Sequence, residues 1–69
     1  MTTTTQTDFH ATQLDRNGWA YKLDGQCWSA QREANGEWAL FDARETLIGT
    51  YPSHLMARMA AIETFEARK

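Results

Sequence analysis

The side chains best suited to metal chemistry in this 69-residue chain are His10, Cys27 and His54. Imidazole nitrogen and thiolate sulfur are ordinary zinc ligands, so the three residues could form a three-ligand site. Zinc motifs usually place ligands in closely spaced pairs, and no two of these residues have that spacing. We therefore predict no metal and no bound cofactor, and we expect His54 to be exposed in the first turn of a helix.

General acid–base catalysis by two carboxylates requires that one member of the pair has a raised pKa. Asp15 and Asp24 stand at predicted turns, where carboxylates usually accept hydrogen bonds from the backbone. The acids near hairpin ends are predicted to be solvated: Glu33, Glu37, Asp42 and Glu45. A short chain also has little room for a pocket of about 300 Å³. We predict that the protein is not an enzyme.

Glycine-containing turns mark the elements that position these residues. Asp24-Gly25 and Asn35-Gly36 are strong hairpin signals, because a type I′ turn needs positive φ at both central residues. Residues 8–14 fit either a first strand or a short helical turn, and the turn signal that follows favours the strand. The later runs predicted as strands are residues 19–23, 26–33, 37–43 and 46–51. This pattern predicts a three- to four-stranded antiparallel β-meander.

A helix is predicted over residues 54–68, which contain no glycine or proline. Pro52 ends the last strand, and Ser53 can cap the helix by accepting a hydrogen bond from a free backbone N–H. Leu55, Met59 and Ile62 follow i, i+4, i+7 spacing and, flanked by Met56 and Phe65, form one apolar stripe. The predicted class is thus α+β, with one C-terminal helix packed on one face of the sheet through this stripe, against Trp19, Trp28 and Leu40.

The turn lengths decide which side chains share a face. A two-residue loop at Asp24-Gly25 pairs Tyr21 with Trp28. The second turn has two alternatives. A two-residue Asn-Gly loop pairs Glu33 with Trp38, whereas a three-residue loop over 34–36 pairs Glu33 with Glu37. We favour the three-residue loop, because it places all three tryptophans on the face that the helix covers.

The opposite face then lacks a cover, since one helix covers only one side. We predict that it binds another protein or a second copy of this chain, through the interaction residues Lys22, Ser29, Gln31 and Phe41. An edge strand is an alternative surface for the same function. A second hypothesis is a nucleic-acid-binding module that reads a groove with its sheet. That hypothesis needs basic side chains on this face, and the sequence supplies only Lys22.

Composition sets the general class. The chain is 42% hydrophobic and 23% charged with a net charge of −2, which fits one folded domain and disfavours binding to phosphate backbones. We predict a flexible tip at residues 1–7 and a single domain at 8–69. No run of about 20 apolar residues and no signal peptide is visible, so we expect a cytoplasmic protein without membrane association.

Overall fold

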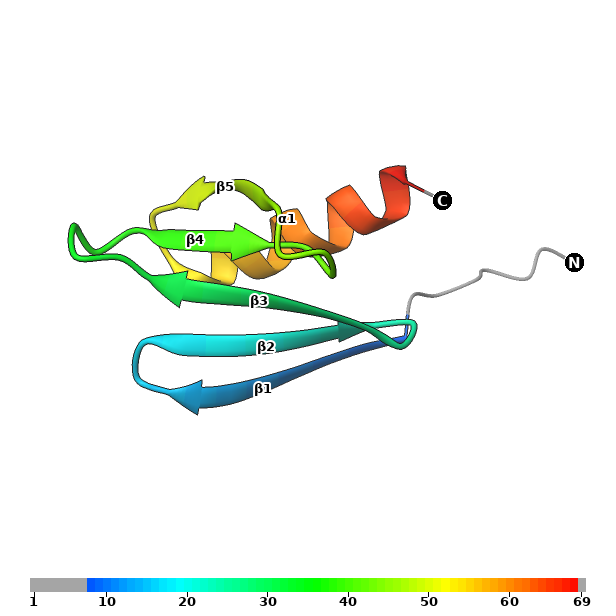
Figure 1. Cartoon of the computed structure of the whole chain (residues 1–69), viewed down its shortest axis with the longest axis horizontal. Helices are drawn as coiled ribbons and strands as arrows, with labels where there is room; N and C mark the ends of the chain where they lie inside the picture. Colours follow the sequence, from blue (N-terminus) through cyan, green and yellow to red (C-terminus); the bar gives the residue numbers. More distant parts are fainter. Residues whose placement is uncertain (1–7, 69) are drawn as a thin grey trace, which may run out of the picture.

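A computed structural model describes residues 8–68, and the tip predicted at 1–7 lies outside the described residues, as does Lys69. Five strands form one antiparallel sheet in chain order, and a single helix follows them within this range (Figure 1). The elements are β1 Phe9–Asp15, β2 Gly18–Leu23, β3 Gln26–Arg32, β4 Trp38–Phe41, β5 Leu47–Tyr51 and α1 His54–Ala67. The α+β class and the meander are confirmed, with five strands where three to four were predicted.

Strand β1 resolves the ambiguity at residues 8–14 in favour of a strand. It pairs with β2 from Phe9 opposite Leu23 to Asp15 opposite Gly18. Asp8 and Asp24 hold the start of this pair together. The Asp24 backbone N–H donates to the Asp8 carbonyl over 2.9 Å, and the Asp8 N–H donates to Asp24 Oδ1 over 2.7 Å. The aspartate of the Asp24-Gly25 turn thus joins the first strand to the next hairpin.

The second hairpin has the predicted three-residue loop. The Glu33 backbone N–H donates to the Glu37 carbonyl over 2.7 Å, and Arg32 lies opposite Trp38. Gly36 has a φ of 87°, a conformation that glycine adopts without the steric cost met by other residues. Asn35 Oδ1 accepts a hydrogen bond from the Glu37 N–H over 3.0 Å and stabilises the loop. This register places Trp38 on the side of the sheet that faces the helix.

The helix begins as predicted, with the Ser53 hydroxyl accepting a hydrogen bond from the Met56 N–H over 3.2 Å. The prediction for its buried side was wrong. The residues of α1 that are buried against the sheet are Ala57, Ala61 and Phe65. Leu55 and Met59 are 56% and 58% exposed, whereas Ile62 and the flanking Phe65 of the predicted stripe pack against the core.

The shape of the sheet explains why the alanines face inward. The largest fully buried side chains are Trp28, Tyr21, Leu23 and Leu40, and all four come from the strands. Large residues on one layer pack best against small residues on the facing layer. Ala57 and Ala61 bring the helix backbone close to these side chains, and both are fully buried. At the end of the helix, the Phe65 ring meets the Trp28 ring edge-on, with centroids 6.1 Å apart.

Candidate functional site

The sheet face away from the helix carries a row of side chains that crosses all five strands. Residues directly opposite each other on neighbouring strands point to the same face. Phe41 lies opposite both Leu47 and Ser29, and Ser29 lies opposite Ala20. Ala20 in turn lies opposite Thr12 on β1. We call this surface, with the neighbouring rows that contain Lys22 and Gln31, the open sheet face.

The four predicted interaction residues all lie on the open sheet face, and three of them are brought together. Ser29, Gln31 and Phe41 line one shallow depression of about 190 Å³ with Glu45, which the prediction did not include. Lys22 is exposed one row away, opposite Cys27. The depression combines a half-buried aromatic ring with hydroxyl, amide and carboxylate groups, the mixture of apolar and polar chemistry typical of non-obligate protein interfaces.

Two exposed leucines on this face were missed by the sequence reasoning. Leu47 is 54% exposed and lies opposite Phe41, and Leu14 is 64% exposed and lies next to Gly18 on the same face. Simple alternation along residues 46–51 does not predict which face Leu47 is on. The register of β5 shifts between the partners of Leu40 and Phe41, so the alternation is interrupted there. The β1 irregularity between Gln13 and Asp15 has the same effect on Leu14.

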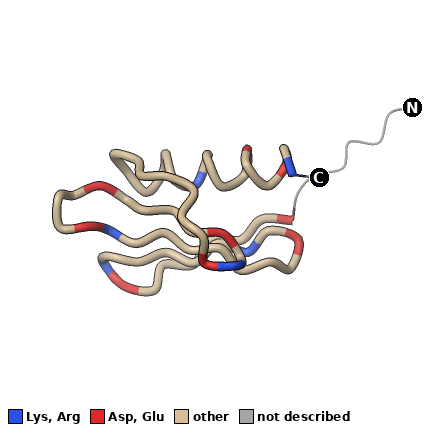
Figure 2. Tube along the Cα trace, turned by 45° about the horizontal axis from the view of Figure 1, so that its top comes forward, with Lys and Arg blue, Asp and Glu red and all other residues tan. Residues whose placement is uncertain are grey.

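Positive charge is sparse on the open sheet face. Lys22 is the only strand cation there among residues 8–68, because Arg32, the other strand cation, lies opposite Trp38 on the helix side. Arg58 lies over the Phe9 ring, 5.0 Å from its centroid, and Arg68 pairs with Asp42. Lysine and arginine positions are distributed among acidic ones in the turns and helix rather than gathered in one area (Figure 2). This distribution is unlike the basic stripe that tracks a phosphate backbone.

The free sheet edges differ in what they offer a partner. In an antiparallel pair, backbone groups point alternately toward and away from the neighbouring strand. The bond between Asp24 N–H and Asp8 O therefore leaves the backbone groups of Phe9, Ala11 and Gln13 pointing outward from β1. Strand β5 is shorter and is followed directly by Pro52, which has no N–H to donate. Strand β1 is the better edge for pairing.

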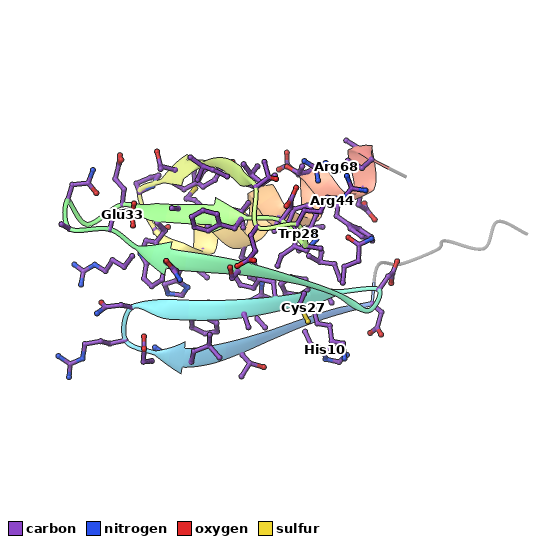
Figure 3. All side chains as sticks on the ribbon, in the orientation of Figure 1. His10, Cys27, Trp28, Glu33, Arg44 and Arg68 are labelled. Carbon is purple, nitrogen blue, oxygen red and sulfur yellow. The ribbon has the colours of Figure 1, made fainter. Side chains whose placement is uncertain are left out.

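A larger hollow, of about 610 Å³, lies where the β4–β5 turn meets the end of α1. Its lining residues are Gln26, Asp42, Ala43, Arg44, Thr46, Phe65 and Arg68. Figure 3 shows Trp28, Arg44 and Arg68 near one another in this region. The guanidinium of Arg68 lies over the Trp28 ring, with Cζ 5.4 Å from its centroid.

The Asp42 carboxylate in this hollow is occupied by structural hydrogen bonds. Oδ1 accepts from the backbone N–H groups of Thr46 and Arg44, both over 2.9 Å, and Oδ2 accepts from Arg68 Nη1 over 2.9 Å. The bond from the Thr46 N–H, followed by that from Arg68, lowers the pKa of Asp42 below its ordinary value of 3.8. This shift is opposite to the raised pKa that a general acid near neutral pH needs, and the three bonds join the β4–β5 turn to the end of α1. The prediction of a solvated Asp42 was wrong, since its side chain is buried.

The three candidate metal ligands are divided between the two faces of the sheet. His10 on β1 and Cys27 on β3 lie on the open sheet face (Figure 3). Both are paired with Lys22, which lies between them on β2. His54 is on the helix side, stacked on Trp19 with ring centroids 4.9 Å apart and edge-on to Trp38 at 5.5 Å. Our expectation of an exposed His54 was therefore wrong. Among the described residues, no three His, Cys, Asp or Glu side chains are grouped to hold a metal ion.

Comparisons of the chain with protein-family models, with curated proteins and with solved structures found no match. The helix within residues 8–68 lacks the length and apolar character needed to cross a membrane.

Proposed function

We propose that this chain is a small non-enzymatic protein-interaction module whose working surface is the open sheet face. One observation carries the proposal: the only helix among residues 8–68 covers one side of a five-stranded sheet and leaves the other side uncovered. That side carries Phe41 and Leu47 in one row beside polar side chains. Exposed apolar groups that lie together and are rimmed by polar residues are typical of binding surfaces.

The chemistry of the depression defines the partner segment. The Phe41 ring offers an apolar wall, Gln31 and Ser29 offer hydrogen-bond donors and acceptors, and Glu45 offers a negative charge. A peptide segment with an aliphatic side chain next to a lysine or arginine would satisfy all of these groups. The seven-residue edge β1 lies on the same sheet and gives an extended partner a second point of contact through backbone pairing.

Two retention experiments test this function against the nucleic-acid alternative. We expect the purified chain to pass through a DNA or heparin column at low ionic strength and to retain a protein from a lysate of its source cells. A Phe41→Ala, Gln31→Ala double variant should lose that protein. Because Phe41 is half-buried, a Gln31→Arg variant provides a second test at an exposed position that leaves the core unchanged.

An Ala34→Arg variant is the control, since Ala34 is exposed in the loop of the second hairpin, away from the depression. It should retain the protein as the wild type does. Tight DNA binding that weakens steeply with salt would contradict the proposal, because such salt dependence reports neutralisation of phosphates. Unchanged retention by both the double variant and Gln31→Arg would also contradict it.

A further inference from the structure

The outer side of α1 carries the larger apolar residues of the helix. Leu55, Met56 and Met59 are all about half exposed, and they are three of the five large hydrophobic side chains exposed within residues 8–68. Ile62 lies one turn beyond Met59 at the border of this side, where it is half-buried and also packs against the core. We call these four residues the outer helix stripe. A helix that is apolar on opposite sides is typically covered on both, and the sheet covers only the alanine side of α1.

A hollow of about 320 Å³ adjoins the outer helix stripe, between the helix and the last strand. It is lined by Tyr51, Met56, Met59, Ala60, Glu63 and Thr64. Methionine side chains adapt their shape to a partner because they are unbranched and flexible. The stripe and the hollow together form a ridge next to a groove, and such a surface can pack against a copy of itself.

We propose that the outer helix stripe packs antiparallel against the outer helix stripe of a second copy of this chain. Leu55, Met59 and Ile62 have the i, i+4, i+7 spacing with which one helix packs along another. The charges select the antiparallel direction. The first turn of α1 contains no acidic residue to complement its positive dipole end, and Glu63 lies in the second half of the helix. An antiparallel partner brings its Glu63 next to that first turn, whereas a parallel partner sets Glu63 beside Glu63.

The position of the twofold axis follows from the residue pattern. Met59 is the middle of the stripe, and an axis at Met59 places Leu55 of one copy beside Glu63 of the other. It also places Met56 beside Ile62 of the other copy. An interface of this kind uses the same patch on both copies. Four side chains per copy are few compared with the roughly 20–30 residues per side of a standard interface, so the dimer dissociates readily on dilution.

This inference goes beyond the proposed function, because it concerns a different surface. The helix lies on one side of the sheet (Figure 1) and buries Ala57 and Ala61 against it, so the outer helix stripe and the open sheet face point away from the core in opposite directions. A dimer through α1 therefore leaves both open sheet faces accessible. Each dimer would present two copies of the proposed binding surface, which strengthens binding to a partner that contains repeated sites.

Sedimentation of the full chain over a range of concentrations tests the dimer. We expect the wild-type mass to rise from one chain toward two as concentration rises. The Leu55→Glu variant should need at least tenfold higher concentration to associate, because it sets a carboxylate beside the partner's Glu63. A glutamate in the first turn also complements the dipole of its own helix, so this variant retains its fold. Circular dichroism verifies the fold.

The Leu47→Glu variant is the matched control. Leu47 and Leu55 are almost equally exposed, at 54% and 56%, but Leu47 lies on the open sheet face and Leu55 on the outer side of the helix. It should associate as the wild type does. A wild-type chain that stays monomeric up to its solubility limit would overturn the proposal. Loss of association in Leu47→Glu, or unchanged association in Leu55→Glu, would equally overturn it.

A second substitution tests the antiparallel register. Adding Glu63→Lys to Leu55→Glu should restore association, because it pairs opposite charges across the two copies. Side chains within one helix contact each other when they are three or four residues apart, and positions 55 and 63 are farther apart than that. Restored association would therefore show that the two positions meet between copies. Failure of the double variant to associate, with its fold intact, would rule out this register.

Discussion

The carboxylate of Asp42 joins the β4–β5 turn to the end of the helix through three hydrogen bonds. Its pKa is lowered by the Thr46 N–H first and then by Arg68, so folding favours the ionised form. The unfolded chain then takes up the proton first as pH falls. The stabilising contribution is complete above the ordinary pKa of 3.8 and is lost as pH falls through the lower pKa of the folded state.

We therefore expect Asp42→Asn to lower the melting temperature at neutral pH and to flatten its decline below pH 3.8. Thermal melts across this acidic range measure both effects. Asp15→Asn is the matched control, because Asp15 Oδ1 accepts one turn hydrogen bond, from the Asn17 N–H over 2.8 Å. A larger loss in Asp15→Asn than in Asp42→Asn would contradict the role given to Asp42.

Tyr21 makes a second polar link between the sheet and the helix. Its hydroxyl donates a hydrogen bond to the His54 carbonyl over 3.1 Å, and burial raises the pKa of the phenol above 10.0. Tyr21→Phe should cost about 1 kcal/mol at neutral pH, the typical net contribution of one hydrogen bond. Urea unfolding of the variant measures this cost, with Tyr51→Phe as a control at a partly exposed ring.

The raised pKa of Tyr21 also predicts the alkaline behaviour of the protein. Its contribution is complete below pH 10.0 and is lost as pH rises through the higher pKa of the folded state, because the unfolded chain releases the proton first. Wild-type stability should therefore fall more steeply above pH 10 than that of Tyr21→Phe. Parallel declines in the two proteins would show that Tyr21 does not titrate on unfolding.

At the scale of elements, the packing of α1 is the clearest test of the structure. Ala61 is fully buried against the sheet and Leu55 is not. We expect Ala61→Leu to destabilise the fold by about 1–3 kcal/mol, because extra methylenes in a packed core force other groups to move. Leu55→Ala should change stability by less than about 0.5 kcal/mol. Chemical denaturation at low protein concentration distinguishes these effects, and the reverse order would show that the helix is turned the other way.

The loop of the second hairpin gives a test of backbone conformation. Gly36 has a φ of 87°, and open space surrounds the position of an added Cβ. Any cost of substitution there comes from the backbone alone. Gly36→Ala should cost about 1–2 kcal/mol, and Gly36→Asn should cost less, because asparagine tolerates the left-handed region. Equal effects of the two substitutions on the unfolding midpoint would argue against the three-residue loop.

The sequence predicted the hairpins better than it predicted the helix packing. Turn dipeptides are local signals, so the positions of both hairpins were accessible, and positive φ at Asp24 and Gly25 fixes the first loop. The length of the second loop followed from grouping the three tryptophans on one face rather than from the Asn-Gly signal. The helix is apolar on two sides, and counting large residues favoured Leu55 and Met59. Ala57 and Ala61 face the sheet because small residues fit against the bulky strand side chains. That fit depends on the distance between the helix and the sheet, which cannot be read from the sequence.

At the scale of the whole molecule, the sheet is the centre of the fold, with one covered and one uncovered face. The alternation along β2 and β3 was sufficient to group Lys22, Ser29 and Gln31 on the uncovered face. The position of His54 between Trp19 and Trp38 was not accessible in this way, because it depends on where the helix starts above two different strands. Local alternation thus predicted the candidate surface, whereas contacts between layers needed the structure.

The most direct test of the open sheet face is site-specific photo-crosslinking. A photo-reactive phenylalanine analogue replaces Gln31 in one sample and Asn35 in another, and each chain is irradiated in a lysate of its source cells. Both positions are exposed, and only Gln31 lines the depression. We predict a covalent adduct with one protein of defined mass from position 31 and none from position 35. The same adduct from both positions, no protein adduct from position 31, or an adduct with nucleic acid there would contradict the account.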